Sequence, residues 1–521
     1  MVDDTFTSAM HGSAARVSRG SMRLVLGVAL AKLVLNVAFH GRYGYFRDEL
    51  YYIACSDHLA WGYVDHPPLS ILILAVTRRL LGDSLDAIRF PAAVAGAVTV
   101  VLTALMARRL GGGRFAQVLA AAAAALSPVV LANGARYFSM NAFDLMFWAL
   151  GAHVLLSILV DGKEKWWLLY GLVAGLGVMN KYSMLFFGFG AVGGLLLTSR
   201  RRELLRPWIW LGGLVAAVIV LPHGIWEIRH HFPSAEFIHN ASTQKNAAIS
   251  IGGFLVEQAN MTGFGQTLLW LLGLAFFMRV GPRPARVFAW MFPIVTAVMI
   301  AGNSKAYYLT PIYFPYWAAG AVAVEMLARK PRLAWSKYAV PVLLAAFSLV
   351  SMPFAIPVLP VDAFVRYQKA LGQTPKQEER SALADLPQFY ADMFGWEEMV
   401  AKVAAVYHAL SPEEQRHCVI YARNYGEAAA IDFFGKRYGL PRCTCAHNSY
   451  WYWGPRDYTG DVMLVLGSNG RGDLEHFRSV EPAGKVGTEY SRRDEHFTIW
   501  ICKGLLLGNL KDVWPRLKKF S

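Results

Sequence analysis

Two acidic positions follow the first long apolar run of the chain. Asp48 and Glu49 are adjacent, and Asp65 stands beside His66 just before Pro67-Pro68. A carboxylate can take a proton from a reacting hydroxyl group, and a carboxylate next to an imidazole can hold a divalent cation or a phosphate. The alternative interpretation is a hydrated loop without a ligand, because such pairs also occur by chance. The chemistry predicted here is therefore proton transfer or anion binding.

A second polar pair opens a later apolar run. Asn141 and Asp144 are three residues apart, so both lie on one side of a helix. An acidic residue just inside a bilayer is a functional hypothesis by default. The alternative is structural: Asn141 would cap the helix, with Asp144 placed favourably in its first turn.

Isolated basic residues add candidates for anion or metal binding. Lys181 interrupts a long apolar stretch, and Lys305 stands at another polar turn. Each suits an anionic partner, but a lysine at a helix end also extends to the membrane surface without any ligand. His239, in a second polar segment, could serve as a metal ligand or could simply be solvated.

The C-terminal part carries an aromatic run and four of the five cysteines. Tyr450–Trp453 places four aromatic side chains beside polar groups, which suits sugar rings, an interface or a plain packing seam. Five cysteines do not make a disulfide scaffold or a zinc ribbon. A bridge is still possible if this part is extracytoplasmic. Its candidate cysteines are Cys418, Cys443, Cys445 and Cys502.

The composition indicates the kind of structure that positions these residues. The 521 residues are 55% hydrophobic and 17% charged, against about 25% charged in soluble domains. These figures exclude a soluble globular protein, a disordered chain and a collagen-like fibre. Residues 1–359 hold 30 Lys and Arg against 16 Asp and Glu, whereas residues 360–521 hold 21 against 20. Of the net charge of +15, +14 therefore lies in a membrane part with basic loops, which disfavours a nucleic-acid partner.

Eleven apolar runs predict about eleven membrane-spanning helices. They lie at about 22–40, 89–107, 115–132, 141–160, 166–180, 182–198, 207–222, 264–278, 287–301, 311–327 and 338–359. Leu69–Leu81 is apolar but short, and basic loops cluster on one side only if this segment lies along the surface instead of crossing. The first run is long enough to span, and no cleavable signal peptide is expected.

This topology places all the candidate residues on the outer face. The predicted domains are a transmembrane part at 1–360 and an extracytoplasmic α/β domain at 361–521. The second has β-like runs at 418–421, 461–466 and 497–502, with a helix at 425–438. The chain lacks a P-loop, a Ser-His-Asp signature and a nucleotide-binding glycine motif, so nucleotide chemistry is not supported.

Two motifs resemble those of the family 39 glycosyltransferases. One is the acidic pair after the first span with the later Asp-His-Pro-Pro-Leu, and the other is Arg-Tyr-Phe-Ser-Met-Asn-Ala-Phe-Asp-Leu-Met-Phe-Trp from Arg136. The resemblance covers about residues 22–330. It implies a GT-C membrane enzyme related to the protein O-mannosyltransferases and the lipid A aminoarabinose transferase. It also implies juxtamembrane helices and a location in the bacterial cytoplasmic membrane.

The resemblance implies an inverting sugar transfer from a polyprenyl-phosphate-linked donor. The acceptor would be a hydroxyl of a lipid, glycan or protein at the outer face of the membrane. Asp48 would be the general base, Glu49 completes its motif, Asp65 would bind a divalent metal, and His66 would face the donor phosphate. His239 matches a metal-ligand histidine of the second loop. A non-catalytic transporter or binding protein for the same lipid-linked sugar is the alternative function.

The sequence departs from the family pattern at two places. Asn141 stands where the family often has an aspartate, so Asp144, one turn further on, is the candidate to take over that role. His66 stands where a lysine is common, which makes its charge depend on pH. Lys181 and Lys305 are therefore the candidates for a fixed positive charge near the donor phosphate.

Overall fold

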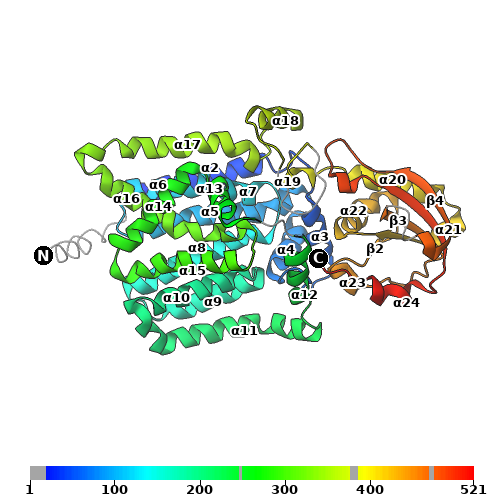
Figure 1. The fold of residues 1–521 in the computed structure, drawn as a ribbon, viewed down its shortest axis with the longest axis horizontal. Helices are drawn as coiled ribbons and strands as arrows, with labels where there is room; N and C mark the ends of the chain where they lie inside the picture. Colours follow the sequence, from blue (N-terminus) through cyan, green and yellow to red (C-terminus); the bar gives the residue numbers. More distant parts are fainter. Residues whose placement is uncertain (1–18, 246–248, 376–384, 469–473) are drawn as a thin grey trace. The chain divides into compact units, whose positions relative to one another are not determined.

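The structure is a computed structural model, and it describes residues 19–245, 249–375, 385–468 and 474–521 (Figure 1). The chain forms two compact units. The helical unit comprises Met1–His40, Asp86–Gly224 and Ala248–Val358, and the sheet unit comprises Gly41–Leu85, Ile225–Ala247 and Leu359–Ser521. Two segments that the sequence places in the transmembrane part thus pack with the C-terminal part.

Each of the eleven predicted apolar runs lies on a helix. Among the described residues, six helices are long and apolar enough to cross a membrane, and the number rises to nine if each of three bent pairs counts as one span. The six spans lie in α2 (Arg19–Ala38), α5 (Leu85–Arg109), α8 (Met140–Asp161), α11 (Pro207–Arg229), α15 (Val287–Ala301) and α17 (Ser336–Ala355). The spans of α15 and α17 include the short 3-10 helices that precede them, η3 (Arg283–Arg286) and η5 (Pro331–Leu333). The other two runs form α9 (Trp166–Asn180) and α16 (Phe314–Ala328), each only 15 residues long. The polytopic helical fold is confirmed, with fewer full-length spans than predicted.

Three pairs of consecutive helices that include predicted runs are bent by more than 40° at a short break. The bent pairs are α6 (Arg114–Leu126) with α7 (Pro128–Ala135), α10 (Ser183–Leu196) with η1 (Ser199–Leu205), and α13 (Ile251–Thr262) with α14 (Phe264–Arg279). Ser127 is extended ahead of Pro128, as proline requires, and Gly263 has φ +97°, which favours glycine. The Ser127 hydroxyl donates to the Thr262 carbonyl at 3.0 Å, so two of the breaks brace each other.

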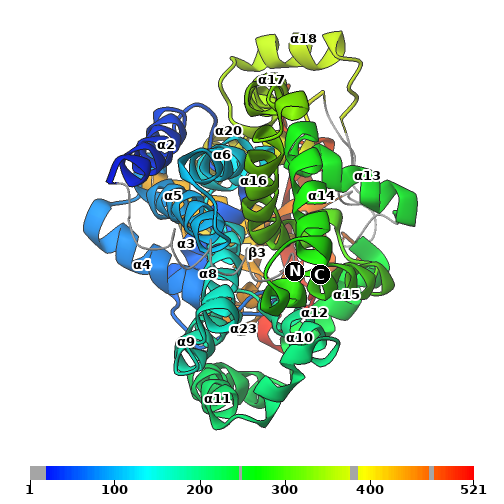
Figure 2. The same ribbon diagram turned by 90° about the vertical axis from the view of Figure 1, so that its left-hand side faces the viewer.

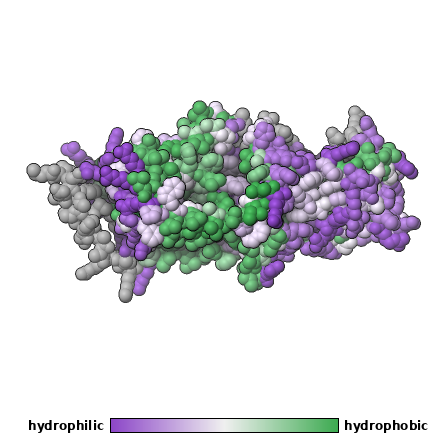
Figure 3. All heavy atoms as spheres, turned by 90° about the horizontal axis from the view of Figure 1, so that it is seen from below, coloured by the Kyte–Doolittle hydropathy of each residue, from purple (hydrophilic) through white to green (hydrophobic). Residues whose placement is uncertain are grey.

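Glycines allow the spans to pack closely. A Cβ at Gly273 of α14 would collide with the Tyr316 carbonyl, and one at Gly320 of α16 with the Leu269 carbonyl. Small residues at such crossings are typical of membrane helices. Figure 2 shows many helices of this unit nearly end-on. Figure 3 shows hydrophobic residues over much of one face of the helical unit, whereas the same view of the sheet unit is mostly hydrophilic.

The sheet unit is built on five strands in the order β2-β1-β3-β5-β4. β1 pairs in parallel with β2 and β3, and β5 pairs antiparallel with β3 and β4. The strands are β1 (Cys418–Ala422), β2 (Thr444–Cys445), β3 (Val462–Ser468), β4 (Phe477–Lys485) and β5 (Thr498–Leu505). The helix after β1 is α22 (Tyr425–Phe434), followed by a 3-10 turn to Tyr438. The α/β prediction is confirmed.

Two strands were missed for physical reasons. β2 has only two residues, too few for a periodic signal. β4 is an edge strand that contains Pro482 and Gly484, with a shift of register between them, and these residues are typical of edges and bulges instead of regular strands.

The bridge that the sequence leaves possible is not formed in the structure. All five cysteines are free and buried. Cys443 Sγ lies 3.3 Å from the Ile420 carbonyl, and Cys502 is part of the core around Val419 and Met463. The thiols of this unit therefore behave as small apolar core residues.

Candidate functional site

Asp48 lies in the first turn of α3 (Arg47–Asp57), within the sheet unit. The neighbouring Glu49 closes the start of this helix, because Phe46 N donates to Glu49 Oε2 at 2.9 Å and Glu49 is fully buried. A capping carboxylate of this kind fixes the entry of the chain into the helix. The two acidic residues of the pair therefore differ, because the Glu49 carboxylate caps the start of its own helix and the Asp48 carboxylate does not.

The Asp48 carboxylate is held at one oxygen. The Tyr425 hydroxyl donates to Asp48 Oδ1 at 2.9 Å, and Arg47 Nε lies 3.6 Å from the same oxygen. The side chain of Asp48 is 32% exposed. Within the described residues, both contacts of this carboxylate use Oδ1, so Oδ2 is left for a ligand.

Asp65 and His66 lie in the loop before α4 (Leu69–Leu81) and are more enclosed. Tyr51 of α3 donates its hydroxyl proton to Asp65 Oδ1 at 2.9 Å. Burial raises the pKa of Asp65, opposed by His66 and by the Tyr51 hydrogen bond. His66 is fully buried, with Nδ1 3.1 Å from the Pro67 carbonyl and Nε2 3.9 Å from Asp65 Oδ1. In this arrangement the imidazole supports Asp65 and presents no exposed atom to a phosphate.

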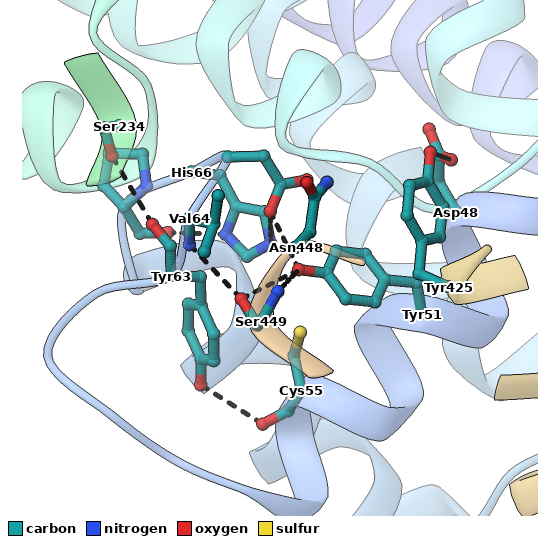
Figure 4. A network of polar contacts seen from close by, with 12 residues as sticks. Asp48, Tyr51, Cys55, Tyr63, Val64, His66, Ser234, Tyr425, Asn448 and Ser449 are labelled. Atoms are coloured by element: carbon teal, nitrogen blue, oxygen red, sulfur yellow. Dashed lines mark hydrogen bonds and ion pairs between the residues drawn. The ribbon is translucent and has the colours of Figure 1, made fainter. Parts of the chain in front are cut away.

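Ser449 connects this loop to α3. It opens α23 (Ser449–Trp453), and its Oγ accepts a hydrogen bond from Val64 N at 3.2 Å. The Tyr51 hydroxyl lies 2.8 Å from Ser449 Oγ and accepts a hydrogen bond from Ser449 N at 3.2 Å. Figure 4 shows Ser449 between Tyr51 and Val64, with Tyr425 beside Asp48.

The aromatic run of α23 is packed. Tyr450 is buried and donates to Asp432 Oδ2 at 3.0 Å. The Trp453 ring stacks on the His58 ring with centroids 4.2 Å apart, and Trp451 exchanges indole-to-carbonyl hydrogen bonds with Trp514. All these partners belong to the sheet unit. These contacts make the aromatic run a packing seam within the sheet unit.

The helical unit contains a second group of candidates, around Asp144 in α8. Ser183 Oγ donates to Asp144 Oδ1 at 2.5 Å, and Lys181 Nζ lies 3.6 Å from Asp144 Oδ2. Lys181 also donates to Asn141 Oδ1 at 2.7 Å, and its ammonium lies 4.6 Å from the centre of the Tyr308 ring. The side chain of Asp144 is only 2% exposed. Lys181 is thus the cation of a buried ion pair instead of a lysine extending freely to the surface.

One expectation for this group is wrong. Asn141 is not the helix cap, because α8 starts at Met140 and its N-cap is Ser139, whose side chain accepts a hydrogen bond from Asn141 N. The amide of Asn141 is therefore available to Lys181. The structure brings together three of the predicted residues here: Asn141, Asp144 and Lys181.

Lys305 and His239 lie at two other elements. Lys305 directly precedes η4 (Ala306–Tyr313), which carries the Tyr308 ring that receives Lys181. His239 is exposed in the last turn of α12 (Pro233–Asn240). In the part of the chain that the structure describes, no three His, Cys, Asp or Glu side chains come together as a metal site. Asp65 and His239 alone do not make a ligand set, and the metal stays a prediction.

Comparison with known proteins identifies relatives over part of the chain. Residues 65–226 match the family profile described as dolichyl-phosphate-mannose-protein mannosyltransferase. Lipid A galacturonosyltransferase RgtD of Rhizobium johnstonii is 27% identical over 213 residues, which is 41% of this chain and 44% of the relative. An undecaprenyl phosphate-alpha-4-amino-4-deoxy-L-arabinose arabinosyl transferase of Pseudomonas fluorescens is 27% identical over 46% of this chain and 50% of its own. The chain thus spans about half the length of these relatives or less.

The structural comparison extends over nearly the whole chain. ArnT from Cupriavidus metallidurans, bound to undecaprenyl phosphate, matches with a TM-score of 0.60 at 13% identity, over 93% of this chain and 98% of that chain. The fold is GT-C. The arabinofuranosyltransferase AftD from Mycobacteria also matches, with a TM-score of 0.52 at 13% identity over 94% of this chain and 40% of its own. The predicted resemblance to GT-C glycosyltransferases is confirmed, and the chain is a multi-span membrane protein.

Sequence reasoning missed three residues of the loop site in this GT-C chain. Tyr51 lies near Asp48 in the sequence and is buried in α3. It could have been found, because the hydroxyl of a buried tyrosine usually has a hydrogen-bond partner. Tyr425 and Ser449 are 377 and 398 residues from their partners Asp48 and Tyr51. No local pattern signals contacts at such separations.

Proposed function

We propose that this protein transfers a sugar from a polyprenyl-phosphate-linked donor to an acceptor hydroxyl at the outer face of the cytoplasmic membrane, with inversion at the anomeric carbon. Support comes from the GT-C fold and from relatives whose names specify transfer of mannose, galacturonic acid and aminoarabinose. The membrane supplies the lipid-linked donor, and the acceptor is a lipid, a glycan or a protein.

Asp48 is the general base of the proposed reaction. The observation that carries this assignment is the state of its carboxylate, which is 32% exposed, with Oδ1 held by Tyr425 and Oδ2 uncommitted. A base must reach within about 2.6–3.2 Å of the hydroxyl whose proton it takes. Asp65 and Asp144 are 14% and 2% exposed, so an acceptor reaches Asp48 more easily.

The step is a single displacement. The acceptor oxygen attacks the anomeric carbon, the bond from that carbon to the donor phosphate oxygen breaks, and the hydroxyl proton passes to Asp48 Oδ2. The leaving polyprenyl phosphate gains negative charge, which a fixed cation stabilises. Lys181 is the cation proposed for this role, with Asn141 and Asp144 holding it in place and Lys305 as an additional positive charge. A divalent cation bound at Asp65 would add to this stabilisation, and no step of the proposal requires it.

The test is donor turnover by the purified full chain in liposomes. A donor panel of undecaprenyl-phosphate-linked mannose, galacturonic acid and 4-amino-4-deoxy-arabinose is offered with lipid A, and release of undecaprenyl phosphate and formation of glycosylated lipid A are followed by mass spectrometry. Transfer from one donor supports the proposal. Binding of every donor without release of undecaprenyl phosphate, also with bacterial envelope extract as acceptor, would instead indicate the non-catalytic transporter or binding protein.

A further inference from the structure

The C-terminal part of the chain reaches α3 and its loop through two polar side chains. Tyr425 is the first residue of α22, directly after β1, and Ser449 opens α23, directly after β2. Both belong to the same compact unit as Asp48 and Asp65. The sheet therefore sets where these two side chains stand.

Tyr425 binds Asp48 through its hydroxyl, and its ring is held by two neighbouring side chains. Its hydroxyl donates to Asp48 Oδ1 at 2.9 Å, its ring lies 4.6 Å from the Tyr51 ring, and the Arg47 guanidinium lies 5.4 Å above its ring. Tyr425 is 6% exposed, so the ring has little freedom to rotate away. Gly426 makes room for this arrangement, because a Cβ there would collide with the side chain of Arg47.

Ser449 fixes Asp65 through Tyr51. The Tyr51 phenol donates to Asp65 Oδ1 at 2.9 Å. Ser449 holds that phenol with its backbone N–H and lies against it with Oγ, which also anchors Val64 N next to Asp65. Asn448 has φ +50°, and the backbone N–H of this residue donates to the Lys519 carbonyl at 2.8 Å. The segment around residue 519 thus holds the turn that presents Ser449.

We propose that Tyr425 and Ser449 are positioning residues, through which the C-terminal α/β domain orients the carboxylates of Asp48 and Asp65 for sugar transfer. This inference rests on the proposed function. A hydrogen bond from a phenol favours the ionised carboxylate and keeps one oxygen in place. Oδ2 of Asp48 is then directed to the acceptor, and the C-terminal domain contributes positioning residues to the site.

The decisive variant is Tyr425→Phe, which removes one hydroxyl and keeps the ring. The charged and titratable groups around Asp48 are Arg47, Tyr52, Asp65 and Tyr425 itself. Without the phenol the Asp48 carboxylate loses a hydrogen bond, so the acidic limb of the kcat/KM profile should move to higher pH. Tyr458→Phe is the matched control, because the Tyr458 hydroxyl donates only to the exposed Arg442 carbonyl in the described structure. Its profile should overlay the wild type.

A pair of variants at Ser449 tests the proposal independently if Tyr425→Phe does not fold. Ser449→Ala removes Oγ, whereas Ser449→Thr keeps it, and we expect about tenfold lower kcat for the first and near wild-type kcat for the second, in line with loss of one hydrogen bond that orients a charged group. The double variant Tyr51→Phe/Ser449→Ala should lose no more than the larger single loss, since both act on Asp65 through one path.

The outcomes separate this inference from the proposed function. If Asp48→Asn keeps wild-type transfer, the proposed base is wrong. If Asp48→Asn loses transfer while Tyr425→Phe shows an unshifted profile and Ser449→Ala keeps its kcat, the base assignment stands and the positioning role is refuted. A shifted profile for Tyr425→Phe together with an unshifted one for Tyr458→Phe supports it.

Discussion

Asp48 and Asp144 are both acidic residues near the start of a helix, yet their surroundings differ. Asp48 is 32% exposed and has one hydroxyl and one guanidinium at a single oxygen. Asp144 is 2% exposed, with a serine on one oxygen and the Lys181 ammonium facing the other. A carboxylate of the first kind can exchange a proton with a ligand, and one of the second kind neutralises a buried cation. The difference favours Asp48 over Asp144 as the proposed general base.

The largest expected effect is the loss of turnover when Asp48 is replaced. Asp48→Asn removes the proton acceptor but keeps the size and hydrogen-bonding capacity of the side chain, so turnover of the active donor should fall about 100-fold or more. Asp57→Asn is the control, since Asp57 ends the same helix and is paired with Arg78 at 2.7 Å. Equal losses of turnover in the two variants would contradict a specific role for Asp48, because loss of either acidic charge on α3 would then have the same effect.

The second effect concerns stability at Asp144. Asp144→Asn leaves Lys181 as a buried cation without its carboxylate, and such a loss typically costs about 3–5 kcal/mol. We expect a clearly lower unfolding temperature in detergent, partly restored by adding Lys181→Met. Asp161→Asn, which breaks a more exposed pair with Arg109, should change it much less. No change in the Asp144 variant would contradict the buried-pair account.

A third and smaller effect tests the polar interior of the sheet unit. Burial raises the pKa of Glu495 to about 7 from 4.5, against the influence of Arg492 and Arg47. The folded state therefore binds the proton more tightly than the unfolded chain, and stability falls as pH rises from about 4.5 to about 7. Glu495→Gln should flatten this fall and stabilise the protein at pH 8 by on the order of 1 kcal/mol.

Thermal unfolding at pH 5 and pH 8 measures this third effect. The exposed Glu489 gives a control variant, Glu489→Gln, which should keep the wild-type pH dependence. A steeper fall in the Glu495 variant, or an equal flattening in the control, would refute the assignment.

The smallest expected effect concerns the cysteines. Because all five are free and buried, dithiothreitol should leave the unfolding temperature unchanged, whereas loss of a structural disulfide typically costs about 2–5 kcal/mol. A lower unfolding temperature in the reductant would show that the sheet unit depends on a bridge.

The sequence predicted which segments are helical better than it predicted where the helices break. Every apolar run became a helix, because hydropathy over a span-length window is a strong signal. Bends were not predicted at 127 and 263, although Pro128 and Gly263 mark them. A single proline or glycine does not say whether a membrane helix continues, since neighbouring helices can satisfy the freed backbone groups, as Ser127 does for Thr262.

The carboxylates of the candidate site were predicted from the sequence. The residues of the C-terminal part that contact Asp48 and Tyr51 were not. Asp48, Asp65 and Asp144 stand out because charge next to apolar runs is costly and therefore informative. Their partners Tyr425 and Ser449 come from the far end of the chain, where a tyrosine after a strand and a serine before an aromatic run look ordinary. Only the sheet, which sets the place of β1 and β2, brings them to α3.

The most direct test of the base assignment is the pH dependence of a single turnover. Undecaprenyl phosphate release is measured with the active donor bound in advance and acceptor added, from pH 4 to pH 9, in the wild type and in Asp48→Asn. We expect the wild-type rate to rise with pH to a plateau as its base ionises, and the variant to be slow with no rise over that range. A variant that keeps the wild-type rise and plateau would contradict the role of Asp48 as the proton acceptor.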